Sequence, residues 1–240
     1  MEARNDAKRG KFGLAPAGTT QAIAAGLAAN VTADGNHLST GANGSKYILP
    51  MLSDSGYGDL AYLVATNPTA PGWGQWFLQC GATTMWEAWE DSSCDTARSR
   101  DHAFMGTVDD WLFSGVGGIS STSPAFRTVS IDPTAGGGLT HASAYETTPL
   151  GRVSSAWTES GTSFALTVQV PVGSTASVCV VGAGSCFPVN ASPKSTSLST
   201  VPAAKVAPSG LHAKAESQSG DPSPWLAGRA GARQIGRAHV

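Results

Sequence analysis

The sequence predicts an α+β protein with a helical segment over residues 1–119, an antiparallel β-sandwich over 120–187 and a disordered tail over 188–240. Three observations support this division. Apolar residues recur at helical intervals in the first segment, and they alternate with polar residues in the second. Neither period continues after Phe187, where Ser, Pro, Ala and Lys dominate. Such a composition buries too little apolar surface to fold.

Four or five short helices are expected in the first segment, after a loop over residues 1–18. The alanine-rich run TTQAIAAGLAAN begins at a threonine, which is a common residue at a helix start. A Gly- and Asn-rich stretch over 35–45, GNHLSTGANGS, predicts a connection full of turns. The remaining helices are expected in YILPMLSDSG, YGDLAYLVATN, WGQWFLQCG and DHAFMGTVDDWLFSGVGGI, each followed or ended by Gly or Asn-Pro.

Five alternating runs in the second segment predict strands: FRTVSIDP, LTHASAYETT, GRVSSAWTE, TSFALTVQVPV and TASVCVV. Turn residues separate them at intervals of roughly ten, as in an antiparallel sandwich. Cys179 and Cys186 flank VVGAGS, which suits a hairpin closed by a disulfide. The alternative is that these two and the other cysteines, Cys80 and Cys94, are free thiols. None of the four forms a CxxC pair, which argues against a zinc site.

The composition excludes several classes of function. The chain has 240 residues, 41% of them hydrophobic, which allows a sizeable core. A net charge of −2 argues against nucleic acid and against a membrane surface as partner. No apolar run approaches the ~18–20 residues that a membrane span needs. No metal or organic cofactor is indicated, and the sequence leaves the cellular location open.

One stretch, GATTMWEAWED, gathers carboxylates and indole rings in a chain with few charges. It sets Trp86 and Trp89 among Glu87, Glu90 and Asp91. Glycoside hydrolysis needs carboxylates in two roles, one to protonate the leaving oxygen and one to attack or to activate water. An amphipathic indole suits the apolar face of a sugar. The stretch therefore fits a sugar pocket, although tryptophans in a core beside a solvated acidic turn would give the same pattern.

The wider sequence resembles a known enzyme family over residues 37–180. The matching pieces are HLSTG, YILPML, GWGQWF, GATTMWEAWED, SRDHAFMGTVDDWLFSGVGGI, FRTVSIDP and GGLTHASAYETTPLGRVSSAW, in this order. They are similar to the bacterial-type α-L-rhamnosidases of glycoside hydrolase family 78. The resemblance implies an (α/α)6 barrel followed by a C-terminal β-sandwich, of which this chain would hold the last helices and the sandwich.

The resemblance also implies roles for individual residues. The family inverts the anomeric centre with two glutamates, and its general base follows the Trp of the GATT-x-WE motif, which is Glu87 in this chain. The general acid belongs to an earlier part of the barrel. His102 matches the histidine that opens the next helix and reaches the sugar, while Trp73 and Trp86 match aromatic positions near the substrate. The loop over 91–100 is shorter than in the family, which puts the reach of His102 in doubt.

The expected protein is thus a C-terminal piece of an enzyme that releases terminal α-L-rhamnose from glycosides or polysaccharides, and the piece should be inactive alone. Two features suggest a piece. The few helices carry strongly apolar faces, and residues 235–240, IGRAHV, match one reading frame of a common sequencing adapter. A natural C-terminus remains the alternative for the second feature.

Two other functions stay open at this point. One is a different (α/α)6 glycosidase that acts on another sugar. The other is a non-catalytic carbohydrate-binding module, in which the β segment binds sugar and the helices support it. The aromatic residues of that segment are spread over several strands, so a stacking platform is not evident.

Overall fold

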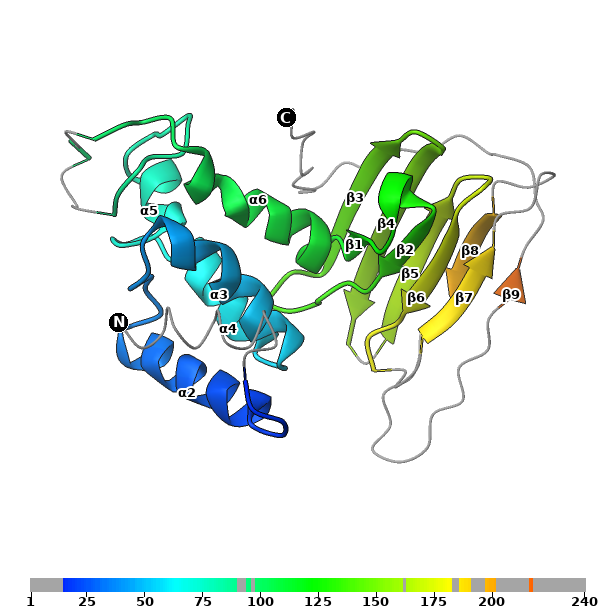
Figure 1. Ribbon diagram of the computed structural model, residues 1–240, viewed down its shortest axis with the longest axis horizontal. Coiled ribbons are helices and arrows are strands. Elements are labelled where there is room, and N and C mark those ends of the chain that lie inside the picture. The colour runs from blue at the N-terminus through cyan, green and yellow to red at the C-terminus, as the bar shows by residue number, and fades with distance from the viewer. Residues whose placement is uncertain are drawn as a thin grey trace. The chain divides into compact units, whose positions relative to one another are not determined.

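The computed structural model describes residues 15–89, 94–95, 98–161, 163–182, 186–190, 197–201 and 216–217. The chain divides into two compact units, Met1–Trp111 and Leu112–Val240 (Figure 1). The boundary lies close to the predicted end of the helical segment. In the described part of the chain, no helix is both long and apolar enough to cross a membrane.

Helices and the loops that join them make up the described part of the first unit. Helix α3 is central, because it contacts α2, α4, η1 and α6, while α5 packs on α4 (Figure 1). The elements are α2 (Thr20–Ala33), α3 (Ala42–Asp54), α4 (Gly58–Thr66), α5 (Trp73–Leu78), the 3-10 helix η1 (Ala103–Gly106) and α6 (Thr107–Trp111). The predicted helices are therefore confirmed, with shifts of a few residues at their ends.

The core of this unit combines aliphatic side chains with tryptophans. Leu27, Ile48 and Leu52 are fully buried. Trp111 packs edge-on against Tyr62, with ring centroids 5.1 Å apart, and its Nε1–H donates to Ser53 Oγ at 2.8 Å. The indole therefore fills the core while its polar atom keeps a partner, as buried tryptophans require.

The predicted connection over 35–45 is wrong in its second half, because α3 already begins at Ala42. Ser45 is buried there, and its hydroxyl donates to the carbonyl oxygen of Gly41 at 3.1 Å. This hydroxyl also lies 3.0 Å from Thr40 Oγ1. Burial and satisfied hydrogen bonds thus outweigh the weak helix propensity of the sequence ANGS. The sequence pattern shows only the weak propensity, because the burial depends on the folded chain.

Two sheets make up most of the second unit. One has the order β1-β2-β6-β7 and the other β3-β4-β5-β8-β9 (Figure 1). The strands are β1 (Ile119–Ser121), β2 (Thr128–Ile131), β3 (His141–Thr148), β4 (Gly151–Ser160), β5 (Ser163–Val170), β6 (Thr175–Cys179), β7 (Cys186–Asn190), β8 (Ser197–Val201) and β9 (Glu216–Ser217). The π-helix η2 (Leu112–Val116) precedes them, and the 3-10 helix η3 (Pro124–Phe126) follows β1.

The pairing is antiparallel except for β2 and β6, which pair in parallel. A parallel pair needs a long crossover, and the meander β3-β4-β5 supplies it. The five predicted strands are confirmed, and the unit is β-rich as expected. That the two sheets form a sandwich stays a prediction.

The core of the β-rich unit follows the predicted alternation. In β4 the buried residues are Val153, Ser155 and Trp157, and in β5 every second residue is buried from Phe164 to Val170. Trp157 stacks on Phe164 at 5.6 Å, and its Nε1–H donates to the carbonyl oxygen of Val116 at 2.8 Å. This unit therefore builds a core with its own strands.

The tail differs from the prediction at three places. Residues 188–190 belong to β7, and residues 197–201 and 216–217 form β8 and β9, of which β8 pairs with β5. Edge pairing explains this difference, because a free edge of β5 offers backbone partners that a composition argument ignores. The rest of the predicted disordered tail, including residues 235–240, lies outside the described residues.

Candidate functional site

A pocket of about 850 Å³ lies in the first unit. Its walls come from residues 38–41, residues 70–71, residues 87–89, Arg98 and Met105. The structure therefore brings two of the sequence motifs together, since HLSTG contributes one wall and GATTMWEAWED another. Glu87 is the sole carboxylate among the described residues that line this pocket.

Glu87 is held by backbone and side-chain contacts to the segment that precedes η1. Its N–H donates to the carbonyl oxygen of Ser99 at 2.9 Å, and the N–H of Ser99 lies 3.3 Å from Glu87 Oε2. A second backbone bond, from the N–H of His102 to the carbonyl oxygen of Met85 at 2.9 Å, runs beside the first. Together these contacts fix the direction in which the carboxylate leaves the backbone.

Arg98 forms an ion pair with Glu87, with Nη1 3.5 Å from Oε1. The side chains of Arg98 and Glu87 are 53% and 35% exposed, so solvent reaches both. Such a pair is worth only ~0.2–1 kcal/mol in stability. Its effect is to orient the carboxylate. Sequence reasoning missed Arg98, because nothing local indicates that this loop returns to Glu87.

Trp89 supplies the aromatic wall of the pocket. Its Nε1–H donates to the carbonyl oxygen of Thr40 at 2.7 Å. Its ring stacks on Trp76 with centroids 4.3 Å apart and meets Trp73 edge-on at 5.3 Å. Trp89 is therefore a fixed surface in the pocket, although only its position between two acids in the sequence pointed to it.

Trp73 and Trp86, which the resemblance assigns to substrate, are buried at 1% and 5% exposure. Neither lines the pocket. The Nε1–H of Trp73 donates to the carbonyl oxygen of Met105 at 2.8 Å, and Trp86 packs against Trp76 at 5.7 Å. In this structure both rings support the pocket from the core. A direct substrate contact for either stays a prediction.

Helix α5, which carries Trp73 and Trp76, lies tightly against the end of α4. At Gly74 a Cβ atom would stand 2.7 Å from the carbonyl oxygen of Thr66, closer than any side chain tolerates. The glycine of GWGQWF thus permits the approach that brings these indoles under the pocket.

His102 precedes η1 and does not line the pocket, whereas Met105 in η1 does. Its ring lies 5.6 Å from that of Phe104. Its Nδ1 is buried and has no hydrogen-bond partner among the described residues. Buried polar atoms usually have a partner, so this nitrogen marks a site that ligand or water can complete. The predicted contact with a sugar is not tested by this geometry.

The cysteines form two disulfides, Cys80–Cys94 and Cys179–Cys186, and no cysteine is free. The predicted hairpin bridge is confirmed on paired strands β6 and β7, with a Cα–Cα distance of 4.1 Å. The alternative of free thiols is wrong. The described residues contain no group of three or more His, Cys, Asp or Glu side chains that could hold a metal ion.

The first unit is helical and sets a carboxylate beside a fixed indole in its pocket, and the second unit is β-rich; both units match domains of one glycosidase family. Residues 11–116 match the family model of the bacterial alpha-L-rhamnosidase 6 hairpin glycosidase domain. Residues 118–185 match that of the bacterial alpha-L-rhamnosidase C-terminal domain. The chain belongs to the bacterial α-L-rhamnosidase family.

Individual α-L-rhamnosidases also match this chain in sequence and in structure. An alpha-L-rhamnosidase of Streptomyces avermitilis is 35% identical over 173 residues, which cover 70% of this chain and 17% of that protein. The crystal structure of a Streptomyces avermitilis alpha-L-rhamnosidase complexed with L-rhamnose matches with a TM-score of 0.68 and 34% identity, over 73% of this chain and 18% of that one. The native Aspergillus terreus enzyme matches with a TM-score of 0.72 and 26% identity, over 89% and 24%.

The chain spans only 15% to 18% of the length of the curated relatives that it matches. The matched region therefore includes the six-hairpin and C-terminal domain types, but it is a small part of each relative. The activity and substrates of the whole protein follow as proposals.

Proposed function

We propose that this chain supplies the base side of an α-L-rhamnosidase active site, in a protein that releases terminal α-L-rhamnose from glycosides or polysaccharides with inversion. Family membership supports the reaction class. The single observation that carries the residue assignment is the pocket itself, in which Glu87 is the one carboxylate among the described lining residues and stands next to Trp89.

In this proposal Glu87 accepts a proton from a water molecule. The oxygen of that water attacks the anomeric carbon on the face opposite the leaving group, while the glycosidic C–O bond breaks. The contacts of Glu87 suit a base. Arg98 and the N–H of Ser99 each hold one carboxylate oxygen. Each oxygen has two lone pairs, so each can still accept a hydrogen bond from water.

The reaction also needs an acid to protonate the leaving oxygen, with the two carboxyl groups ~6.5–9.5 Å apart. Asp95 is a poor candidate, because its carboxylate pairs with Arg100 at 3.6 Å and does not line the pocket. Glu90 and Asp91 lie outside the described residues, and the resemblance implies that the acid comes from an earlier part of the barrel. For this reason the chain alone should not turn over rhamnosides.

The non-catalytic alternative, a carbohydrate-binding β unit, has less support. Trp157 and Phe164 are buried. The ring of Tyr145 is covered by Arg152, whose guanidinium carbon lies 3.9 Å from the ring centroid. The described β-rich unit therefore offers little free aromatic surface on which a sugar could stack.

The test replaces the matching part of the Streptomyces avermitilis enzyme with residues 37–187 of this chain. The chimera should hydrolyse p-nitrophenyl α-L-rhamnoside, and proton NMR of the first turnovers should show the β-anomer of rhamnose. The chain alone should release no nitrophenol above background. Release of the α-anomer first would refute inversion, and turnover by the chain alone would refute the need for an outside acid.

A further inference from the structure

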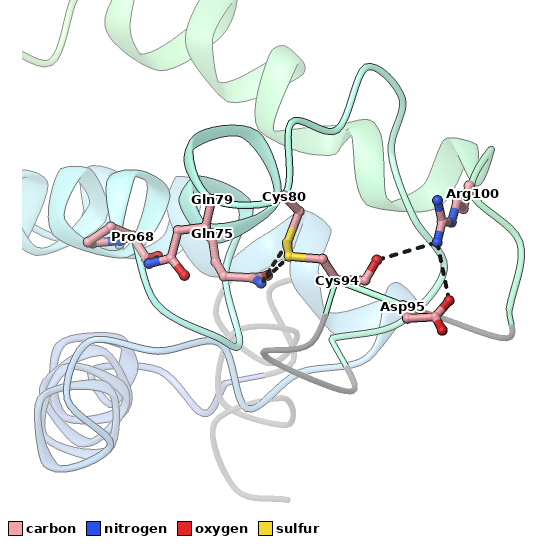
Figure 2. The surroundings of a disulfide bond; sticks show 7 residues. All are labelled: Pro68, Gln75, Gln79, Cys80, Cys94, Asp95 and Arg100. Atoms are coloured by element: carbon pink, nitrogen blue, oxygen red, sulfur yellow. Dashed lines mark hydrogen bonds and ion pairs between the residues drawn. A yellow bond between two sulfur atoms is a disulfide. The ribbon is translucent and has the colours of Figure 1, made fainter.

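The loop that carries Glu87 is tied to helix α5 by a covalent bond. We call residues 87–89, 94–95 and 98–99 the Glu87 loop. Cys94 of this loop forms a disulfide with Cys80, just beyond the end of α5, with a Cα–Cα distance of 5.3 Å (Figure 2). The pocket residues Glu87, Trp89 and Arg98 flank Cys94 in the chain, so the bond acts on the wall of the pocket.

Cys80, the partner of Cys94 next to α5, is held by contacts with Gln75. The N–H of Cys80 donates to the carbonyl oxygen of Gln75 at 3.2 Å. The side chain of Gln75 is buried at 1% exposure, and its amide nitrogen lies 2.8 Å from Cys80 Sγ (Figure 2). The same nitrogen lies 3.7 Å from Cys94 Sγ, so one buried amide contacts both sulfurs of the bridge.

Arg100 holds the other side of Cys94. Its Nη2–H donates to the carbonyl oxygen of Cys94 at 3.3 Å and lies 3.6 Å from Asp95 Oδ1 (Figure 2). Its guanidinium carbon is 5.0 Å from the centroid of Trp86, which is a cation–π distance. Arg100 directly follows Ser99, the residue that binds Glu87, so the same segment fixes both Cys94 and Glu87.

The ion pairs of this loop, Arg98–Glu87 and Arg100–Asp95, join side chains that solvent reaches, and such pairs are individually weak. The disulfide is the one link that cannot open by thermal fluctuation. We propose that Cys80–Cys94 positions Glu87, so that the pocket forms in the oxidised chain and opens on reduction. A catalytic consequence of this positioning rests on the proposed role of Glu87 as the base. The positioning of the loop by the disulfide does not depend on that role.

A dithiol can reduce the Cys80–Cys94 disulfide and so release the loop. Dithiothreitol gives two electrons and two protons, the S–S bond breaks, Cys80 and Cys94 become thiols, and the reagent closes to its cyclic disulfide. Both cysteines are partly exposed, so a reductant can reach them. The chain offers a matched control, because Cys179–Cys186 joins strands β6 and β7, which a ladder of hydrogen bonds already pairs.

Amide hydrogen exchange of the whole purified chain, followed by NMR, tests the proposal. The variant Cys80→Ala/Cys94→Ala should exchange the amides of Glu87 and His102 at least about ten-fold faster than the unmodified chain, while the amides of α3 keep their rates. The control Cys179→Ala/Cys186→Ala should leave Glu87 and His102 unchanged. Equal rates at Glu87 in the first variant and the unmodified chain overturn the proposal.

Two further measurements separate positioning from general support. In a dithiothreitol titration, exchange at Glu87 should rise with the fraction of Cys80 and Cys94 that alkylation traps as thiols. If α3 loses protection in step with Glu87, the disulfide supports the whole unit and the positioning role is wrong. Arg100→Ala should show a smaller effect of the same pattern, which Arg100→Lys partly restores. None of these readouts uses a rhamnoside, so failure here and failure of the proposed function are distinguishable.

Discussion

The two units of the chain differ in how completely they cover their own apolar side chains. The first unit leaves Leu63, Phe77, Leu78 and Phe104 exposed by 41% to 64%. The β-rich unit exposes Leu139 and Val172, by 38% and 48%, and buries Trp157, Phe164 and Leu166 of β4 and β5. The sheets thus bury their faces with their own strands, while the helices carry faces that the described residues do not cover.

The difference follows from the periodicity of each part. A strand pairs with its neighbour in the sequence, so a local meander assembles one continuous apolar face. An amphipathic helix has an apolar face that must pack against other elements. With few helices, some of these apolar faces stay uncovered. The exposure of Leu63, Phe77 and Leu78 agrees with this reasoning. That they face further helices of an (α/α)6 barrel stays a prediction.

The largest stability effect is expected from the core of the β-rich unit. Trp157→Ala should cost ~3–5 kcal/mol, because the indole is 1% exposed, stacks on Phe164 and donates to Val116. Leu78→Ala, in the first unit, should stay within ~0.5 kcal/mol, because that side chain is 64% exposed. Urea unfolding of both variants measures this. Similar losses would contradict the contrast between the units.

A second, smaller effect concerns association. Leu63→Ser and Leu78→Ser together should reduce self-association of the purified chain without loss of stability, because they remove apolar surface from an uncovered face. Val172→Ser in the β-rich unit is the matched control and should change association less. Light scattering over a concentration series decides. If Val172→Ser reduces self-association more, the associating surface lies in the β-rich unit, which contradicts the explanation.

The smallest effect is a pH dependence in the β-rich unit. Burial raises the pKa of Glu146 above its ordinary 4.5. The folded state therefore binds this proton more tightly, and stability should fall as the pH rises from 4.5 through the folded-state pKa. Glu146→Gln should remove this fall, so its advantage should appear at neutral pH and vanish toward pH 4.5. A pH-independent difference in unfolding free energy would contradict the explanation.

Local patterns predicted the helices, five strands and the hairpin disulfide because neighbours in sequence determine them. Three features of the site are different. Arg98 meets Glu87, Cys94 meets Cys80, and Trp89 meets Thr40 only after the chain has folded back. The burial of Trp73 and Trp86 belongs to the same class, since an aromatic in a motif has the same sequence signature in a core and at a pocket wall. The resemblance located the acidic loop, and packing decided which of its residues reach the pocket.

The measurement that tests the central claim most directly is the turnover of Glu87→Gln in the chimera with the Streptomyces avermitilis enzyme. Because a general base acts in the transition state, kcat should fall by ~10²-fold or more while KM changes little. Glu159→Gln in β4, outside the pocket, is the matched control and should keep full activity. A Glu87→Gln chimera that retains more than about a tenth of the kcat would contradict the assignment of Glu87 as the base.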